Sequence, residues 1–335
     1  MDDKEVFTSV VTPCFNGEKF IDNYMKGIFS QTTKAFEVII TDDGSTDNSL
    51  EKLKSYEDKF NSNGISYRVI HKESGGQPSA FNIGVSYASG KYIVWPDIDD
   101  LMHPDFIEKK ALYMEEHYSV DFLLSKSAIV NISEPDKIIG YTWPVPFKNN
   151  EDLMNRILWD KNIWYEPGAF MCKASSLDKF IKNRKIYQDC GKWSGPQFQI
   201  MLPFFFYGNV GYLNDCLYDY YIHEKQDHNK FNKKEDIIRK CDEVEKTIVS
   251  TVKSLDANEK EMNGMLEIIK IRMNLTRLYS AFKFRDRIWF NSLYNAIPKK
   301  YISRNDKIRH ILINYLNNNF SYRVYNEISK HRNKV

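Results

Sequence analysis

Residues 92–105 read YIVWPDIDDLMHPD, a short apolar run that passes directly into an acidic loop. The apolar part, residues 92–95, has the length and composition of a buried strand. The aspartates that follow are Asp97, Asp99 and Asp100. Carboxylates this close together repel one another unless a cation or a positively charged partner offsets their charge. Hard oxygen ligands suit Mg²⁺ or Mn²⁺, so the loop is a candidate metal site. The other interpretation is a solvated cluster at the start of the helix near Pro104.

The chain before this loop alternates between strand and helix patterns. Short apolar runs at 7–12, 36–41 and 65–70 predict three further strands. Helical patterns lie between them, including one that runs to about Phe60 and one at 78–88 that begins with proline. Strands separated by single helices are typical of a mostly parallel, doubly wound sheet, which binds ligands at the carboxyl ends of its strands. The predicted fold class is therefore α/β.

Polar and turn-forming residues collect where these predicted strands end. They include Asn16, then Asp42, Asp43 and Ser45, then Gly75, Gly76 and Gln77, and finally the aspartates of the acidic loop. Such residues make turns in any loop, but four such loops at one edge of a sheet favour a ligand site. The first loop lacks GxGxxG, which disfavours a dinucleotide site, and the absence of GxxxxGK[ST] excludes a P-loop.

Composition narrows the class of protein. The chain has 335 residues, of which 42% are apolar and 27% charged, as expected for a globular protein of about two domains. No run approaches the ~18–20 apolar residues of a membrane span, and the acidic start MDDKEVF is unlike a signal peptide. The 5 cysteines include no CxxC pair, which argues against a disulfide framework and a zinc ribbon. We therefore expect a cytoplasmic protein.

The formal net charge of +2 conceals an uneven distribution. Residues 1–110 carry 12 Lys and Arg against 18 Asp and Glu, whereas residues 283–335 carry 12 against 3. From about residue 233 the apolar residues recur at helical spacing, which predicts a helical region with a basic end. Three roles for it stay open: an accessory bundle, a homo-oligomer interface, or peripheral contact with anionic lipid at the inner face of the membrane. No nucleic-acid module is recognisable, so no nucleic-acid partner is expected.

Three segments, in this order, resemble the motifs of family 2 glycosyltransferases of the GT-A fold. They are VVTPCFNGEKF (10–20), FEVIITDDGSTDNS (36–49) and ESGGQPSAFNIGVSYASGKYIVWPDIDD (73–100). The resemblance implies transfer of a hexosyl or N-acetylhexosaminyl group from a nucleoside-diphosphate sugar, with inversion, assisted by Mn²⁺ or Mg²⁺. The donor would be a UDP-sugar, and the acceptor a bacterial surface glycan, a lipid-linked glycan or a glycoprotein. The expected parts are a GT-A domain at 1–230, with a nucleotide-sugar half (1–107) and an acceptor half (108–230), and a helical region at 231–335.

The resemblance also implies roles for individual residues. Nucleotide binding would fall to Pro13, Phe15, Asp43, Gln77, Asn82 and Asp97. The ring of Phe15 would stack on the nucleobase, and Asp43 would accept a hydrogen bond from it. Asp99, the second aspartate of the DxD pair, would ligate the metal ion. Asp100 is expected to support the N-terminus of the helix that follows.

The catalytic base is where the sequence departs from the family pattern. Many inverting relatives use the Asp of an ED pair, at the start of a helix, to take the proton of the acceptor hydroxyl. The equivalent stretch here, GPQFQIMLP at 195–203, has no carboxylate and is similar to a subgroup with GQNWQ-like segments. The nearest acids are Asp189 and Glu166, and Asp189 is the favoured candidate; the other interpretation makes it a turn residue.

A histidine after the closing strand often completes the metal or diphosphate site in relatives, and imidazole is an acceptable Mn²⁺ ligand. His228 matches this position best, with His223 as the alternative; a surface histidine without a function also stays open. A chain that has kept the nucleotide pocket but lost its base would be a non-catalytic nucleotide-sugar-binding or assembly partner of another glycosyltransferase.

Overall fold

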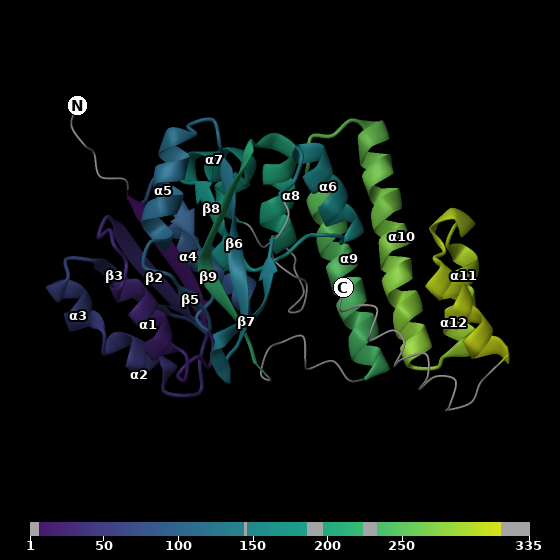
Figure 1. Cartoon of the computed structure of the whole chain (residues 1–335), viewed down its shortest axis with the longest axis horizontal. Helices are drawn as coiled ribbons and strands as arrows, with labels where there is room; N and C mark the ends of the chain where they lie inside the picture. Colours follow the sequence, from purple (N-terminus) through teal and green to yellow (C-terminus); the bar gives the residue numbers. More distant parts are fainter. Residues whose placement is uncertain (1–6, 144–145, 186–196, 224–232, 316–335) are drawn as a thin grey trace. The chain divides into compact units, whose positions relative to one another are not determined.

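The computed structural model describes residues 7–143, 146–185, 197–223 and 233–315. The chain forms two compact units, which Figure 1 shows in sequence colours. The first comprises Met1–Lys230 and Lys246–Asp256, and the second Phe231–Glu245 and Ala257–Val335. This geometric division does not test the functional division predicted at residue 230, which stays a prediction.

Among the described residues, the first unit is built on a nine-stranded sheet, in which eight strands follow the order β3-β2-β1-β4-β8-β6-β9-β5 and the ninth, β7, pairs with β6. The strands are β1 (Thr8–Cys14), β2 (Phe36–Asp42), β3 (Ser66–His71), β4 (Tyr92–Val94), β5 (Leu101–Met102), β6 (Phe122–Asn131), β7 (Glu134–Thr142), β8 (Phe170–Lys173) and β9 (Val210–Ile222). The strands β3, β2, β1 and β4 run parallel, so their carboxyl ends share one edge. Beyond them, β8 pairs antiparallel with both β4 and β6. The predicted α/β class is confirmed.

Helices cover both faces of this sheet (Figure 1). They are α1 (Ile21–Phe29), α2 (Ser49–Lys54), α3 (Glu57–Ser62), α4 (Gln77–Ser86), α5 (Phe106–Glu116), α6 (Asn150–Trp159), α7 (Ala174–Phe180) and α8 (Gln197–Tyr207). On one face, Ile28 of α1 and Phe106 of α5 pack into a cluster with Val38 of β2. On the other, Phe81 of α4 packs edge-on against Trp95, with ring centroids 5.6 Å apart. Burial of these apolar side chains provides the main driving force for folding.

The expected single helix up to Phe60 is instead two short helices, α2 and α3. The break falls at Ser55, whose hydroxyl donates to the carbonyl of Lys52 at 2.7 Å. Side chains of this kind compete with the helical hydrogen-bond pattern of the backbone. Leu53 and Phe60 are nevertheless both fully buried, so the apolar spacing that predicted one helix serves two.

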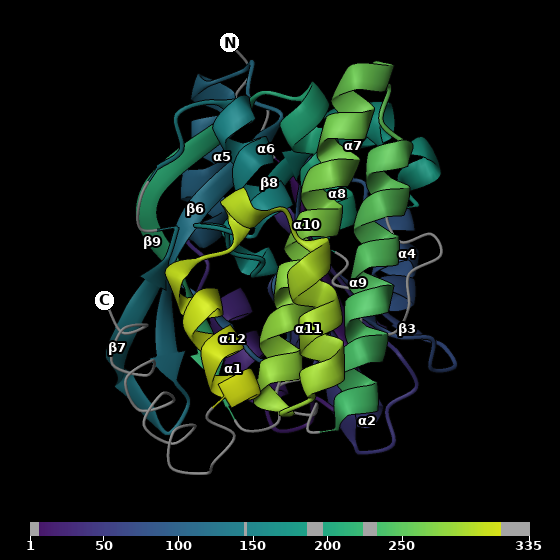
Figure 2. The same ribbon diagram turned by 90° about the vertical axis from the view of Figure 1, so that its right-hand side faces the viewer.

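The second unit is helical, as predicted. It contains the first part of α9 (Lys234–Lys253), then α10 (Glu259–Lys283), α11 (Arg287–Ala296) and α12 (Arg304–Tyr315). Figure 2 shows α10, α11 and α12 together. Their core includes Leu278, Phe282, Phe290, Ile302, Leu312 and Ile313. Across the described ranges, no helix has both the length and the apolar character that crossing a bilayer requires.

Candidate active site

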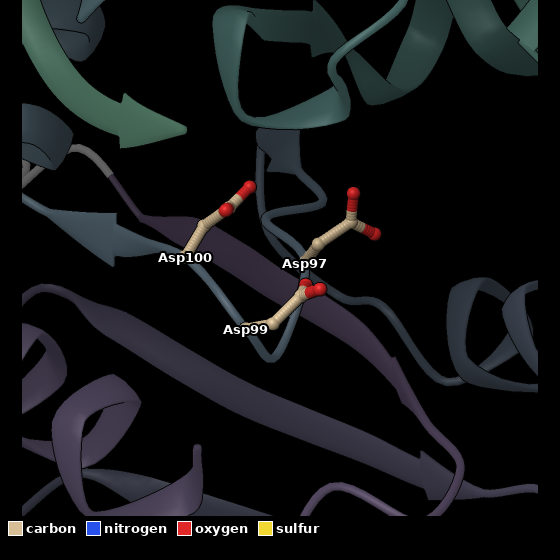
Figure 3. Close-up of side chains that lie close together, drawn as sticks. All are labelled: Asp97, Asp99 and Asp100. Atoms are coloured by element: carbon tan, nitrogen blue, oxygen red, sulfur yellow. The ribbon is translucent and has the colours of Figure 1, made fainter. Parts of the chain in front are cut away.

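The loop after β4 gathers three carboxylates at the edge of the sheet. Asp97, Asp99 and Asp100 each offer an oxygen, and these oxygens lie within 4.8 Å of one another. Figure 3 shows all three side chains on the turn between β4 and β5. Asp97 and Asp99 are partly exposed, whereas Asp100 is buried. The structure therefore brings the predicted DxD pair together at the carboxyl end of a parallel strand.

Asp100 is bound to β9 rather than to the helix that follows the loop. Its Oδ2 accepts a hydrogen bond from the Tyr218 hydroxyl at 2.9 Å, and its Oδ1 accepts one from the Tyr221 N–H at 2.9 Å. Burial and the neighbouring Asp99 and Asp97 raise the pKa of the Asp100 carboxyl well above its usual value. The expectation that Asp100 supports the helix N-terminus is wrong, because α5 begins only at Phe106 and the carboxylate is already engaged by β9.

Asp97 links the acidic loop to two other elements. Its backbone N–H donates to the Tyr218 hydroxyl at 3.0 Å, and its Oδ1 accepts a hydrogen bond from Gln77 Nε2 at 3.1 Å. Gln77 is the first residue of α4. Two residues predicted to bind the nucleotide, Asp97 and Gln77, therefore lie in direct contact.

Asp99 faces a histidine at the end of β9. The distance between Asp99 Oδ2 and His223 Nε2 is 2.9 Å, and the ring of His223 packs against Phe20 with centroids 4.9 Å apart. His223 is the alternative that the sequence placed behind His228. His228 and Asp189 lie outside the described residues. A carboxylate beside an imidazole, with two more carboxylates close by, fits the ligand preferences of a divalent ion such as Mn²⁺.

Asp43 occupies a second carboxylate site, at the end of β2. Its N–H donates to the Cys14 carbonyl at 2.8 Å, which fixes it next to the end of β1. Its Oδ1 accepts from Lys72 Nζ at 2.6 Å and from the Gly75 N–H at 2.9 Å, and its Oδ2 accepts from the Gly76 N–H at 2.7 Å. Gly76 has φ 88°, a conformation that glycine adopts at little cost. Asp43 is only 3% exposed.

Sequence reasoning missed Lys72. The signal was available, because this lysine follows β3 directly and the ends of β2 and β3 are neighbours in a parallel sheet. A strand-end lysine beside a strand-end aspartate is an ion pair that topology alone could have suggested.

The remaining predicted nucleotide residues lie on β1 and α4. Pro13 is half-buried near the end of β1, and Phe15, which follows that strand, is 52% exposed. An exposed aromatic face beside a buried carboxylate is suited to a planar ligand. Asn82 is half-buried on α4.

Glu166, an acid of the predicted acceptor half, is more deeply buried than the partly exposed Asp97 and Asp99. Glu166 is 6% exposed, and burial raises the pKa of its carboxyl to about 8. Gln197 begins α8, and the first turn of this helix contains no acidic residue. The described first turn of α8 therefore offers no carboxylate at the position where the family pattern predicted the base.

Comparison with known proteins finds similarity to glycosyltransferases. The model of Glycosyl transferase family 2 matches residues 9–179. The glycosyltransferase GlyG of Streptococcus pneumoniae serotype 4 is 29% identical over 220 residues, which are 63% of this chain and 69% of GlyG. An uncharacterized glycosyltransferase of Rickettsia felis is 36% identical over 131 residues, 39% of this chain. That match covers only 20% of the rickettsial protein.

Among solved structures, residues 1–349 of Staphylococcus aureus TarS in complex with UDP-GlcNAc superpose with a TM-score of 0.65. The match covers 97% of this chain and 92% of the TarS chain at 19% identity, which shows a shared fold. The predicted GT-A fold is thereby confirmed. Since the family model covers the β1 to α7 region, including both carboxylate sites, this chain belongs to the family 2 glycosyltransferases.

Proposed function

We propose that this chain transfers a hexosyl or N-acetylhexosaminyl group from a UDP-sugar to a glycan, a lipid-linked glycan or a glycoprotein. The observation that carries the proposal is the cluster of Asp97, Asp99 and Asp100 at the carboxyl end of β4. Family membership supports the reaction class. The UDP-GlcNAc bound to TarS, a protein of the same fold, supports the choice of donor.

The environment of Asp43 supports a uracil base. Uracil presents its N3–H donor between two carbonyl oxygens, and a carboxylate is the natural acceptor for that donor. The N–H groups of Gly75 and Gly76 are engaged by Asp43 itself, whereas the Lys72 ammonium has three N–H bonds and would be a further donor for a carbonyl oxygen of the base. The exposed ring of Phe15 would stack on the base. Cytosine carries an acceptor at N3, which would face the carboxylate unfavourably.

A divalent ion, Mn²⁺ or Mg²⁺, would be held by Asp99, with Asp97 facing the ribose side of the nucleotide. His223 is the described histidine in contact with Asp99, and His228 stays the candidate that the sequence favours. When bound, such an ion neutralises the charge that develops on the departing diphosphate. Gln77 would keep the Asp97 carboxylate oriented through its amide.

Inversion requires a group that takes the proton of the acceptor hydroxyl. We propose Asp189 for this role, as the sequence suggests. Glu166 is less suited to it, because its carboxyl is buried and its raised pKa favours the protonated form at neutral pH.

A second function is favoured by one observation, the absence of any acid in the first turn of α8. In that case the chain would be a non-catalytic nucleotide-sugar-binding or assembly partner of another glycosyltransferase. The same aspartate loop would then hold the nucleotide without turnover.

One experiment separates the two functions. The protein is incubated with Mn²⁺, a panel of UDP-sugars and an acceptor extract, and UDP release is followed for the wild type, Asp99→Asn and Asp189→Asn. Transfer that is lost in both variants supports the enzyme with Asp189 as base. Tight Mn²⁺-dependent UDP binding without turnover favours the binding partner. Full activity in Asp189→Asn would show that Asp189 is not the catalytic base. Thermal shifts with UDP, GDP and CDP test which nucleobase the site prefers.

We also propose a cytoplasmic location, with the GT-A domain at 1–230 and the helical region at 231–335 as separate functional parts. Exposed basic residues of the helical region include Lys299, Lys300, Arg304 and Lys307. They support peripheral contact with anionic lipid at the inner face of the membrane, where each nearby charge adds about 1 kcal/mol. Sedimentation with phosphatidylglycerol vesicles tests this, and light scattering tests the competing role as a homo-oligomer interface.

A further inference from the structure

One lysine of the first unit is completely buried on the helix that follows the aspartate loop. Lys110 on α5 is 0% exposed, and its Nζ lies 4.2 Å from the ring centroid of Phe106. Burial lowers the pKa of its ammonium group well below the usual value. Taking an ammonium group out of water costs several kcal/mol unless nearby polar groups compensate. The contacts of Lys110 therefore point to a role that an apolar side chain could not fill.

The ammonium group holds a single turn of the backbone. Lys110 Nζ donates to the carbonyl of Gly168 at 2.9 Å. Gly168 belongs to the turn Pro167–Ala169, which leads directly into β8. Glu166, just before this turn, is buried as well. Burial lowers the pKa of the Lys110 ammonium group and raises the pKa of the Glu166 carboxyl, and the proximity of the two groups offsets part of each shift.

Gly168 in turn lies directly against the ring of Tyr218. A Cβ at position 168 would stand 2.1 Å from Cζ of that ring, so only glycine allows this approach. The opposite support of the ring comes from α5, since the centroids of Phe106 and Tyr218 are 5.8 Å apart. The position of the Tyr218 ring is thus set by the turn that Lys110 holds and by the helix that carries Lys110.

The hydroxyl of Tyr218 connects this support to the acidic loop. It accepts the hydrogen bond from the Asp97 N–H at 3.0 Å and donates one to Asp100 Oδ2 at 2.9 Å. We infer that Lys110 is a positioning residue for the aspartate loop, acting through Gly168 and the Tyr218 hydroxyl. The inference rests on the proposed use of Asp97 and Asp99 to bind the nucleotide and its metal ion. Lys110 itself touches neither.

The test compares Lys110→Met with Lys109→Met, its neighbour on the same helix. Methionine keeps the length of the side chain but cannot hold the Gly168 carbonyl. Lys109 is exposed and pairs with Asp105 and Asp215, so it controls for the loss of a lysine from α5. Binding of Mn²⁺ in the presence of UDP is followed by electron paramagnetic resonance of the free ion, together with the thermal midpoint. We expect Lys110→Met to weaken Mn²⁺ binding about tenfold, the size typical of residues that orient metal ligands.

The expected pattern has three further parts. The thermal midpoint of Lys110→Met changes little, because removal of the cost of burying a charge offsets the loss of the donor to the Gly168 carbonyl. Turnover of Lys110→Met recovers at saturating Mn²⁺. The Mn²⁺ concentration that gives half-maximal turnover therefore changes more than kcat does. Lys109→Met binds Mn²⁺ like the wild type.

A double-mutant cycle tests the proposed connection directly. Tyr218→Phe keeps the ring and removes the hydroxyl, so its effect on Mn²⁺ binding should combine with that of Lys110→Met less than additively. If Lys110→Met does not fold, Gly168→Ala interrupts the same connection and takes its place in the cycle. Additive effects, or Mn²⁺ binding by Lys110→Met equal to the wild type, would overturn the inference. If the inference about Lys110 fails but Asp99→Asn still loses Mn²⁺ binding, the proposed function stands. If the wild type itself binds no Mn²⁺ in the presence of UDP, both the inference and the proposed function are overturned.

Discussion

Asp43 and the Asp97–Asp100 loop lie at the same edge of the sheet, and the chain surrounds them differently. The carboxylate of Asp43 accepts hydrogen bonds from the Lys72 ammonium and from two backbone N–H groups. The acidic loop concentrates three carboxylates within 4.8 Å, among amide, phenol and imidazole groups. One charge is balanced by a lysine of the chain itself, whereas the three would need a cation from outside to offset their repulsion. Under the proposed function, aspartate would serve base recognition at one strand end and cation binding at another.

The largest effect is expected for Asp99→Asn. The amide cannot neutralise a divalent ion, so sugar transfer should fall by about 100-fold or more. Removing one of several clustered negative charges should leave the free energy of unfolding unchanged or raise it. UDP release and urea unfolding measure the two effects. Asp105→Asn, which changes a partly exposed acid paired with Lys109, is the matched control and should keep full activity. Equal losses in both variants would contradict the assignment.

The comparison predicts the opposite effect on stability for Asp43→Asn. This change removes the ion pair with Lys72 and weakens the bonds from Gly75 and Gly76, so the free energy of unfolding should fall by about 2 kcal/mol. UDP affinity should fall about tenfold at the same time, because a neutral amide replaces the charged acceptor for the base. Urea unfolding and calorimetric titration with UDP provide both values. An Asp43→Asn protein as stable as the wild type would show that Lys72 does not hold the carboxylate in this way.

A smaller effect on UDP binding is expected at Phe15, whose side chain would contribute by stacking and not by hydrogen bonds. Loss of one stacking ring in Phe15→Ala should cost about 1–2 kcal/mol of UDP binding. Phe15→Tyr, which keeps the ring, should bind UDP like the wild type. Equilibrium titration with UDP at fixed Mn²⁺ is the measurement. If both variants lose the same affinity, stacking is not the contribution of this residue.

The smallest effect concerns the pair of His103 and Asp219, which ties the acidic loop to β9. His103 Nε2 lies 2.9 Å from Asp219 Oδ1, and this bond raises the pKa of the imidazole above 6.5. Because the folded-state pKa is raised, the stabilisation is fully present below pH 6.5 and is lost as the pH rises through the raised value.

His103→Gln should therefore lower the free energy of unfolding by about 1 kcal/mol near pH 6, and by less near pH 9. Urea unfolding of both proteins at the two pH values gives the difference. A difference that grows with pH would contradict the role of the charged imidazole.

Much of this arrangement could be predicted because it depends on local sequence. Apolar runs that end in Asp43 or in the Asp97–Asp100 loop predict strands with polar ends, and parallel pairing then places those ends at one edge. The helical pattern after residue 233 is equally local, since apolar spacing alone indicates an amphipathic helix.

What the sequence could not predict depends on partners far along the chain. Asp100 was expected to support the next helix, but its partner Tyr218 is 118 residues away. Separation along the chain also hides the role of Lys110, whose partner Gly168 is 58 residues away. From the sequence alone, Lys110 resembles any lysine on the surface of a helix. His223 and His228 are separated by only five positions in the sequence, and it is the course of β9, which ends at Ile222, that places His223 against Asp99.

The central claim is that the acidic loop binds a divalent ion together with the nucleotide. Anomalous scattering from crystals grown with UDP and Mn²⁺ tests it most directly. The account predicts one strong manganese peak within ligand distance of an Asp99 carboxylate oxygen, and its loss in Asp99→Asn crystals. A structure with UDP stacked on Phe15 but without manganese at Asp99, or with manganese bound elsewhere, would contradict it.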